Sequence, residues 1–373
     1  MDTLTHALSG ALVARLIVAR GATPPSAAAS APLPWQAVLV GLVAGAFPDI
    51  DAVAQAFGDV AYLTHHRGIT HSVLMLPFWA LLVAWLMAQA FRRTRGQPGS
   101  WKSFYVIAAA GIGIHIVGDW ITQFGTMLLE PFSDRRFGLG SMFIIDLTFS
   151  GLLLAGLALA AVFPRSRWPA AAGLAATAAW VGLATVGQYE AIDVGQRYAR
   201  AQGMTHPVVT VMPRPASPFN WTVTVFDGQN YHLAHVNTRR TEVLQADADS
   251  NFIRRFSAPY LPEPMARWEQ VPRFGGPGAP VWVQEAWNAP AFAFFRWFAQ
   301  TPALMQGPAG DWDAGRGAGA ERCAWFRDLR FDFPGREEGP FRYCVCLAAT
   351  PGAAAQVYKL ETEEGRPVRT RVQ

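Results

Sequence analysis

The chain has 373 residues, of which 51% are hydrophobic and only 16% are charged, a composition that leans towards a membrane protein. Its pI is near 9.1, but the basic residues are scattered among acids and form no patch with interleaved aromatics, so we expect no nucleic-acid partner. Charge is also unevenly spread, because residues 1–189 contain 11 Lys and Arg and residues 190–373 contain 20.

Apolar stretches of about 20 residues, the length that crosses a bilayer, fill the first half of the chain. Four meet this length easily, and the two that precede them are shorter or end in a polar turn. We therefore expect a polytopic helical membrane bundle of about six helices, over residues 3–19, 35–57, 70–91, 101–123, 142–163 and 168–189. An Ala, Ser and Pro run over residues 23–34 predicts a loop between the first two helices.

The pattern changes after residue 189, where charged residues become frequent and the apolar runs become short. Residues 190–202 predict an exposed helix and residues 285–299 an apolar aromatic helix. Short strands with turns between them are predicted over residues 208–212, 221–226, 231–236, 323–333, 341–348 and 356–361. The predicted fold class is thus mainly α, with a membrane bundle over residues 1–189 and a soluble α+β domain over residues 190–373.

Lys and Arg in short loops indicate the orientation of the bundle, because such loops stay in the cytoplasm. The connection after the third predicted helix contains Arg92, Arg93, Arg95 and Lys102, and the one after the fifth contains Arg165 and Arg167. We expect those loops inside the cytoplasm and the second half of the chain outside it. The three cysteines lack the CxxC spacing of a zinc module and do not bear on the compartment.

Several ionisable residues lie near the ends of the predicted helices, and all of them fall towards the same membrane face. Placed by depth, the set is His6, Asp49, Asp51, His71, His115, Asp119 and Asp146. Ionisable groups at membrane depth are costly unless they are paired, hydrated or bound to a cation, so the set predicts a functional site. Imidazole and carboxylate ligands suit Zn, Mn or Fe, and there are enough of them for one or two divalent ions.

Taken singly, these residues have simpler interpretations. His115 and Asp119 are one helical turn apart, which suits either chelation of one ion or a helix–helix hydrogen bond. An Asp at a helix end, such as Asp49 or Asp51, often caps the next helix. A lone helical His such as His6 is often a packing residue. Their coincidence at one face is what favours the metal interpretation.

The segment Thr64–Ser72 holds three of the eight histidines within seven residues, directly before a predicted span. An interfacial polar cluster with Thr70 as the helix cap explains its hydroxyls but not its histidines. In a hydrolytic site, Arg67 would hold a phosphate or another anion with two hydrogen bonds, and one His would act as acid or base. We predict catalytic roles for His65, Arg67 and Asp146.

Five motifs together resemble the YdjM-type family of bacterial inner-membrane metal-dependent hydrolases, in a long form with a C-terminal soluble domain. They are Met1–His6, Phe47–Asp51, His65–Ser72, His115–Asp119 and Ile145–Asp146. The resemblance covers about residues 1–190, and it implies a metal site formed by His6, Asp49, Asp51, His66, His71, His115 and Asp119, with Asp146 also matching.

The resemblance implies a multi-pass protein of the bacterial inner membrane that hydrolyses an ester or phosphoester with the help of a divalent metal. We expect the bilayer as its surroundings and a lipid-linked or envelope molecule as its substrate. The alternative is a non-catalytic membrane protein, either a metal or proton transporter or an envelope scaffold, that uses the same His and Asp residues. A transporter would spread ionisable residues through the depth of the bilayer, whereas here they gather at one face.

Overall fold

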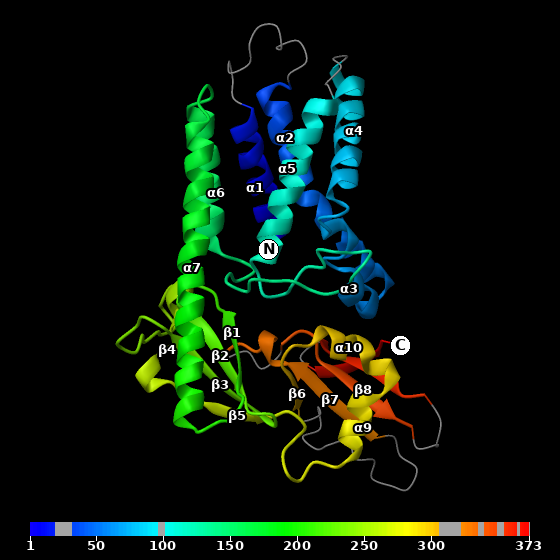
Figure 1. Ribbon diagram of the computed structural model, residues 1–373, viewed down its shortest axis with the longest axis vertical. Coiled ribbons are helices and arrows are strands. Elements are labelled where there is room, and N and C mark those ends of the chain that lie inside the picture. Colours follow the sequence, from blue (N-terminus) through cyan, green and yellow to red (C-terminus); the bar gives the residue numbers. More distant parts are fainter. Residues whose placement is uncertain are drawn as a thin grey trace.

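A computed structural model describes residues 1–18, 32–95, 101–305, 322–334, 339–348, 354–363 and 366–372. A bundle of helices lies at one end of the molecule, two β-sheets lie at the other, and one long helix, α7, runs from the bundle into the sheets (Figure 1). The loop predicted over residues 23–34 lies outside the described residues except for residues 32–34.

The helical part contains seven α-helices and two 3₁₀ helices among the described residues. They are α1 (Thr3–Ile17), α2 (Pro34–Ala46), η2 (Phe47–Phe57), α3 (Asp59–His65), η3 (Ile69–His71), α4 (Leu76–Arg95), α5 (Trp101–Trp120), α6 (Leu147–Val162) and α7 (Trp168–Ala201). Three helical segments are long and apolar enough to cross a membrane, namely α2 continued by η2, α5 and α7.

The α3–η3 segment and α4 meet the same criterion only together, with a bend of 80° between them, and α1 and α6 are apolar but shorter. The structure therefore confirms a helical protein with three candidate membrane spans. The count of six spanning helices stays a prediction.

The helix predicted from residue 70 begins later, at Leu76, because the backbone before it is held in another conformation. Residues 69–71 form the single turn η3, and Ser72 is extended. Its hydroxyl donates to the carbonyl of Glu130 at 2.6 Å, and the next amide, that of Val73, donates to the carbonyl of Leu128 at 3.0 Å. The segment that follows α5 thus fixes the chain just before α4.

Helix α7 continues without a break across the boundary predicted at residue 189. Its first half is apolar and lies in the bundle, while its second half packs on the first sheet (Figure 1). Ala191 and Val194 are buried there against Trp221 and Val223. One rigid helix therefore connects the two parts of the molecule, whereas the predicted domain boundary at this position stays a prediction.

Two five-stranded sheets follow α7. The strands of the first sheet are β1 (Val208–Pro213), β2 (Asn220–Phe226), β3 (Asn230–Asn237), β4 (Leu261–Pro262) and β5 (Glu269–Pro272). Strands β1, β2 and β3 are antiparallel neighbours in that order. Strand β3 also pairs with β4, which is parallel to it, and with β5, which is antiparallel to it. The second sheet is antiparallel in the order β10-β9-β8-β7-β6; its strands are β6 (Pro302–Met305), β7 (Arg322–Asp328), β8 (Tyr343–Leu347), β9 (Gln356–Glu363) and β10 (Arg366–Arg371).

Three short helices accompany the sheets: α8 (Phe252–Ser257), α9 (Trp282–Asn288) and α10 (Ala293–Phe298). The single helix predicted over residues 285–299 is wrong, because Pro290 divides it. The residue before a proline avoids the helical conformation, and Ala289 is extended, with φ −55° and ψ 136°. Short 3₁₀ turns, η4 (Glu263–Met265), η5 (Pro290–Phe292) and η6 (Leu329–Phe331), complete the described elements.

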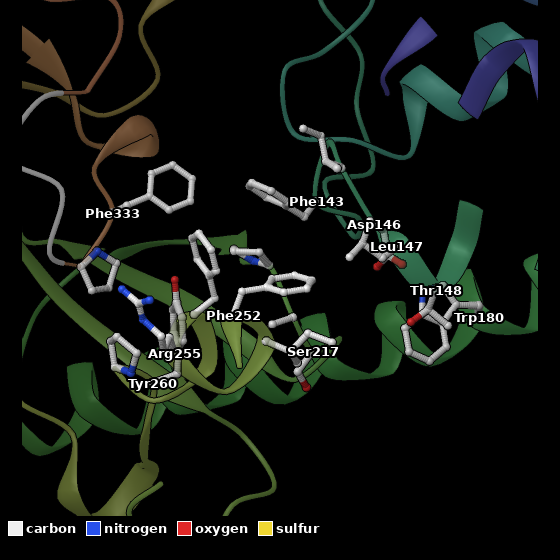
Figure 2. Close-up of a pocket in the computed structure, with 17 residues that line it drawn as sticks. Phe143, Asp146, Leu147, Thr148, Trp180, Ser217, Phe252, Arg255, Tyr260 and Phe333 are labelled. Carbon is white, nitrogen blue, oxygen red and sulfur yellow. The ribbon is translucent and has the colours of Figure 1, made fainter. Parts of the chain in front are cut away.

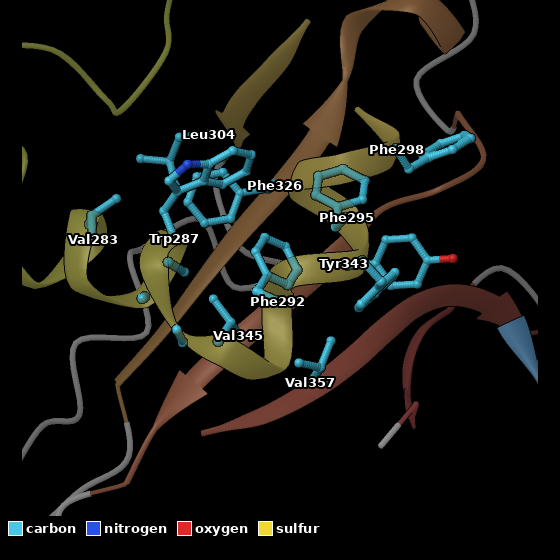
Figure 3. Close-up of a cluster of buried hydrophobic side chains, with 14 of the residues drawn as sticks. Val283, Trp287, Phe292, Phe295, Phe298, Leu304, Phe326, Tyr343, Val345 and Val357 are labelled. Carbon is cyan, nitrogen blue, oxygen red and sulfur yellow. The ribbon is translucent and has the colours of Figure 1, made fainter. Parts of the chain in front are cut away.

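An aromatic core lies between the second sheet and the helices α9 and α10 (Figure 3). Trp287 and Phe292 pack there against Phe326 of β7, and Phe295 packs against Phe292. Leu63 of α3 is buried in the same core. The second sheet is therefore joined by apolar packing to the segment that carries the three neighbouring histidines.

Two further contacts define how this part of the molecule is held together. Lys359 of β9 forms a salt bridge with Asp59 at the start of α3, with 2.7 Å between Nζ and Oδ2. Cys323 and Cys346, which lie opposite each other on β7 and β8, form a disulfide. Because two of the three cysteines are joined, this group does not offer three thiolates to a metal, although Cys344 lies beside them.

Close packing of α1 on α2 depends on glycines whose missing side chains let the two backbones touch. A Cβ atom on Gly10 would lie 2.1 Å from the carbonyl oxygen of Gly41, and one on Gly45 would lie 2.4 Å from that of His6. Gly41 and Gly45 are one turn apart, the spacing of small residues at membrane helix interfaces. This contact places the end of α2 beside the start of α1.

We expect Gly10→Ala to lower the free energy of unfolding by about 1–3 kcal/mol, because the added methyl group meets backbone rather than a movable side chain. Thermal unfolding in detergent measures the change. Gly151→Ala on α6 is the matched control, since a Cβ there meets nothing within 4 Å and alanine favours the helix by about 0.5–1 kcal/mol. Equal destabilisation by both substitutions would contradict this role of Gly10.

Candidate metal centre

Four side chains from three separate elements meet at the end of the bundle that faces the sheets. Asp49 comes from η2, His71 from η3, and His115 and Asp119 from the last turns of α5. Each offers one ligand atom, and these four atoms all lie within 4.8 Å of one another. We call these four residues the His/Asp cluster. The last three are fully buried, and the Asp49 side chain is 13% exposed.

The ligand atoms of the cluster face each other rather than separate partners. The Nε2 atoms of His71 and His115 are 3.0 Å apart. Asp119 Oδ2 lies 3.0 Å from the first and 3.5 Å from the second. Asp49 Oδ1 is the most distant member, 3.8 Å from His71 Nε2 and 3.6 Å from His115 Nε2.

Hydrogen bonds on the far side of each imidazole determine which nitrogen carries a lone pair. His115 Nδ1 lies 2.6 Å from the carbonyl oxygen of Gly45, which can only accept, so this nitrogen donates and Nε2 is left as a ligand. His71 Nδ1 lies 3.0 Å from Asp51 Oδ2, and the same reasoning applies. A metal-binding imidazole is typically oriented by such a second hydrogen bond.

The resulting arrangement fits a divalent cation. Two lone pairs and two carboxylate oxygens converge without a donor between them when both imidazoles are neutral. Asp119 Oδ2 is buried and receives no hydrogen bond, although His71 Nε2 is within 3.0 Å. A proton on His71 Nε2 would be shared with one carboxylate oxygen, whereas one metal ion would contact all four ligand atoms. Two nitrogen and two oxygen ligands suit Zn, Mn or Fe.

Asp51 lies behind His71 and organises the histidine-rich segment instead of joining the four converging atoms. Its Oδ1 accepts from His66 Nδ1 at 2.8 Å, and its Oδ2 accepts from the amide of Arg67 at 2.8 Å and from the hydroxyl of Thr70 at 3.0 Å. One carboxylate thus holds the His66–His71 turn. Asp51 and His66, both predicted as ligands, are placed one contact further out.

Arg67 and His6 both contact the other oxygen of Asp119. Arg67 Nη2 lies 2.9 Å from Oδ1 and His6 Nε2 lies 3.0 Å from it. The His6 ring also stacks on that of His115, with 3.7 Å between ring centroids. The Arg67 guanidinium is buried and additionally donates to Thr122 Oγ1 at 2.7 Å. It therefore supplies a fixed positive charge beside Asp119.

Two of the predicted catalytic residues lie apart from the cluster. His65 is exposed at the end of α3. Asp146 is the N-cap of α6, where its carboxylate accepts from the amide of Phe149 at 2.8 Å. Of the residues predicted from the sequence, the structure brings His6, Asp49, Asp51, His66, Arg67, His71, His115 and Asp119 into one connected network.

Four groups in this network were missed by sequence reasoning. The Gly45 carbonyl orients His115, and Thr70 and Thr122 hold Asp51 and Arg67. Thr3 donates to Asp49 Oδ2 at 2.6 Å. Thr122 had a signal in its spacing, because it follows Asp119 by three residues and so lies on the same face of the helix end. Thr3 and Thr70 lie within the motifs Met1–His6 and His65–Ser72, but nothing in those motifs assigned them these partners.

The loop after α5 closes the site on the side of the sheets. Arg136 Nη2 donates to the carbonyls of Leu63 at 2.7 Å and His66 at 3.1 Å. Burial, followed by the charges of Arg67 and Arg330, lowers the pKa of Arg136 to about 10, so it remains charged at neutral pH. This cation fixes the end of α3 above the second sheet.

A groove of about 380 Å³ opens beside the exposed edge of Asp49. Apart from Asp49, it is lined by Thr3, Val43, Ala46, Phe47 and Ile50. Ile50 is 59% exposed and Val43 is 38% exposed, on a segment apolar enough to cross a membrane. The groove thus lies on the outer face of the bundle and borders Asp49, the one member of the cluster with an exposed edge.

We expect Asp51→Asn to weaken metal binding about 10–100-fold, because an amide no longer holds both imidazoles of the His66–His71 turn as a carboxylate does. Competition with a chelator of known affinity measures the change on the purified chain. Asp134→Asn, in the exposed part of the loop after α5, serves as the control and leaves binding unchanged. Equal affinities for both variants would refute the role given to Asp51.

Comparison with known proteins finds a family for the first half of the chain. Residues 1–191 match the family described as YdjM inner membrane protein. The chain is also similar to the uncharacterized protein YfhP of Bacillus subtilis (strain 168), with 26% identity over 147 residues, which are 39% of this chain and 42% of that protein. The chain therefore spans less than half the length of this relative. No solved structure matches. Because the family match covers more than half of the 373 residues and includes the whole His/Asp cluster, the chain belongs to the YdjM inner membrane protein family.

Proposed function

We propose that this chain is a membrane-bound, metal-dependent hydrolase that cleaves an ester or phosphoester bond. The observation that carries the proposal is the convergence of four buried ligand atoms whose imidazoles are oriented from behind by Gly45 and Asp51. Asp49, His71, His115 and Asp119 would hold one ion. When bound, such an ion lowers the pKa of a coordinated water towards neutrality and polarises the scissile group.

His66 fits the role of general base in this proposal. Its Nδ1 is held by Asp51, so Nε2 is left to accept a proton, and its ring centroid lies 6.2 Å from that of His71. The side chain is 14% exposed and stacks on Tyr62, which fixes the plane of the ring. His65, which we predicted for this task, is exposed and has no comparable partner among the described residues.

A lipid-linked substrate suits the apolar lining of the groove that borders Asp49. The groove beside Asp49 is lined by apolar side chains of η2 and α2, so an uncharged chain would lie against Val43 and Ile50 while the bond to be cleaved approaches the carboxylate. Arg67 would keep the net charge of the cluster low by pairing with Asp119.

A transporter is less well supported by the distribution of charge. Among the described residues, the other buried charged side chain of the helical bundle is Arg15, near the opposite end of α1, where it donates to the carbonyls of Ala160 and Pro164. Between this residue and the cluster the packed core is apolar, with Ala37, Val40 and Ile112 fully buried. The buried charged side chains described in the bundle therefore gather near its two ends, whereas a transporter would spread them through its depth.

The purified wild-type chain is expected to hold about one metal ion and to hydrolyse a phosphoester or ester from a panel that includes phospholipids. His71→Ala combined with His115→Ala removes two of four ligands, so both the metal and the activity are lost. Elemental analysis and initial rates measure the two. A double variant with full metal content would refute the site, and full metal content in the wild type without any hydrolysis would favour the non-catalytic alternative.

His66→Ala separates binding from catalysis in the same assay. It lacks the proposed base but keeps all four ligands, so metal content stays near the wild-type value while the rate falls about 10²–10⁴-fold. His65→Ala is the matched control, since the neighbouring exposed histidine keeps both properties.

We further propose that the sheets lie outside the cytoplasm. The Cys323–Cys346 disulfide supports this orientation, because disulfides persist in the bacterial periplasm and are rare in the cytosol. The end of α4, which contains Arg92, Arg93 and Arg95, and the connection between α6 and α7, which contains Arg165 and Arg167, lie at the opposite end of the helices from the sheets (Figure 1), as expected for cytoplasmic ends.

Alkaline phosphatase reports this orientation, because it folds to an active form only outside the cytoplasm. We expect activity from a fusion after Gln373 and none from a fusion after Arg95. The reverse pattern would overturn the orientation while leaving the metal site untouched.

A further inference from the structure

A second cavity, separate from the His/Asp cluster, lies where the bundle meets the first sheet. Its volume is about 840 Å³, within the range of sites that enclose a small molecule. Its walls come from five parts of the chain: the segment before and at the start of α6, the middle of α7, the connection between β1 and β2, the short helix α8 with the residues just after it, and the residues that follow β7. Asp146, which has no place in the metal site, lies at its rim.

The cavity is mainly apolar and aromatic. Figure 2 shows Phe143 and Phe333 facing Phe252 across it, with Trp180 at one end. Phe256 of α8 also lines the wall and is 56% exposed. Such a concentration of unburied apolar surface in a hollow is unfavourable in water, so it indicates a binding site for an apolar group.

One wall of the cavity belongs to elements of the membrane part. Trp180 is part of α7, a candidate span, and Leu147 is the first residue of the apolar helix α6. The opposite wall, α8, belongs to the first-sheet region. The cavity therefore lies at the depth where the bundle ends, which is the depth of lipid headgroups and the first part of their chains.

Charged groups at the cavity indicate what kind of lipid fits. Arg255 is exposed and lies beside Tyr260 at the end away from Trp180 (Figure 2). Asp146, the other charged residue of the lining, is already engaged as the cap of α6. Arginine pairs well with phosphate because its planar donors match two phosphate oxygens.

We propose that this cavity binds a membrane phospholipid, with an acyl chain against Phe143, Phe252 and Phe256 and the phosphate at Arg255. Lipid binding here does not depend on hydrolysis at the His/Asp cluster, because it uses different residues. The bound lipid would fasten the first sheet to the membrane beside α7.

Native mass spectrometry of the full chain, extracted in mild detergent and supplied with phosphatidylglycerol, tests the proposal. We expect about one retained lipid on the wild type. Phe256→Asp, which brings a carboxylate into the apolar wall, lowers retention at least about tenfold, and Arg255→Gln lowers it about threefold. Arg254→Gln and Phe132→Asp are the matched controls, because neither residue lines the cavity and both are exposed, so retention is unchanged.

A photoactivatable phosphatidylglycerol on the unmodified chain gives a second readout that does not depend on how well a variant folds. Cross-links within residues 143–148 and 252–260 support the proposal. Cross-links confined to the outer faces of α4 and α5, or equal lipid retention by Phe256→Asp and Phe132→Asp, would overturn it. Neither result depends on metal content or hydrolysis, so failure here is distinguishable from failure of the proposed function.

Discussion

Two carboxylates, Asp49 and Asp119, face two imidazole nitrogens at the end of a largely apolar bundle, and negative charge buried in such a place has to be neutralised locally. Arg67 neutralises one oxygen of Asp119 from behind. The oxygens that point inward face the Nε2 atoms of His71 and His115, which carry no fixed positive charge as the Arg67 guanidinium does. The surrounding hydrogen bonds are arranged to keep these atoms directed at a common point.

That arrangement depends on packing as much as on polar contacts. The glycine contact between α1 and α2 fixes the end of α2 beside α1, and Gly111 lets α5 approach that end closely. The Gly45 carbonyl at this end then orients His115. On the other side, the loop after α5 and the second sheet hold the His66–His71 turn through Arg136 and Leu63. The second sheet and the loop after α5 therefore help to hold the histidine-rich turn that carries His71.

Hydropathy predicted where the long apolar helices lie, because burial in an apolar layer is a local property of sequence, but it did not predict the short helix α3. It also grouped Asp146 with the other polar residues, whereas this residue caps α6 away from the cluster. Local pattern does not reveal interruptions imposed by neighbours, as at Ser72, where a distant carbonyl determines the backbone. Sequence pattern also missed two features of the helices. It did not predict the division at Pro290, although that proline is visible in the sequence, and it did not predict that α7 continues through residue 189.

For the site, the sequence predicted the residues that gather but not their roles. Asp49 and Asp51 are two residues apart and chemically identical, yet one faces the cluster and the other holds His71 from behind. Likewise His65 and His66 are adjacent at the end of α3, yet the side chain of His65 is exposed while that of His66 contacts Asp51. Such distinctions depend on side-chain directions in a 3₁₀ helix and a turn, which periodicity does not specify.

X-ray absorption spectroscopy of the metal-loaded chain tests the central claim most directly, since it reports the atoms bound to the ion. We predict a shell of nitrogen and oxygen atoms at about 2.0–2.2 Å with the scattering signature of two imidazole rings and no sulfur. A sulfur shell at about 2.3 Å, or a spectrum without imidazole, would contradict the assignment of the metal centre to His71 and His115.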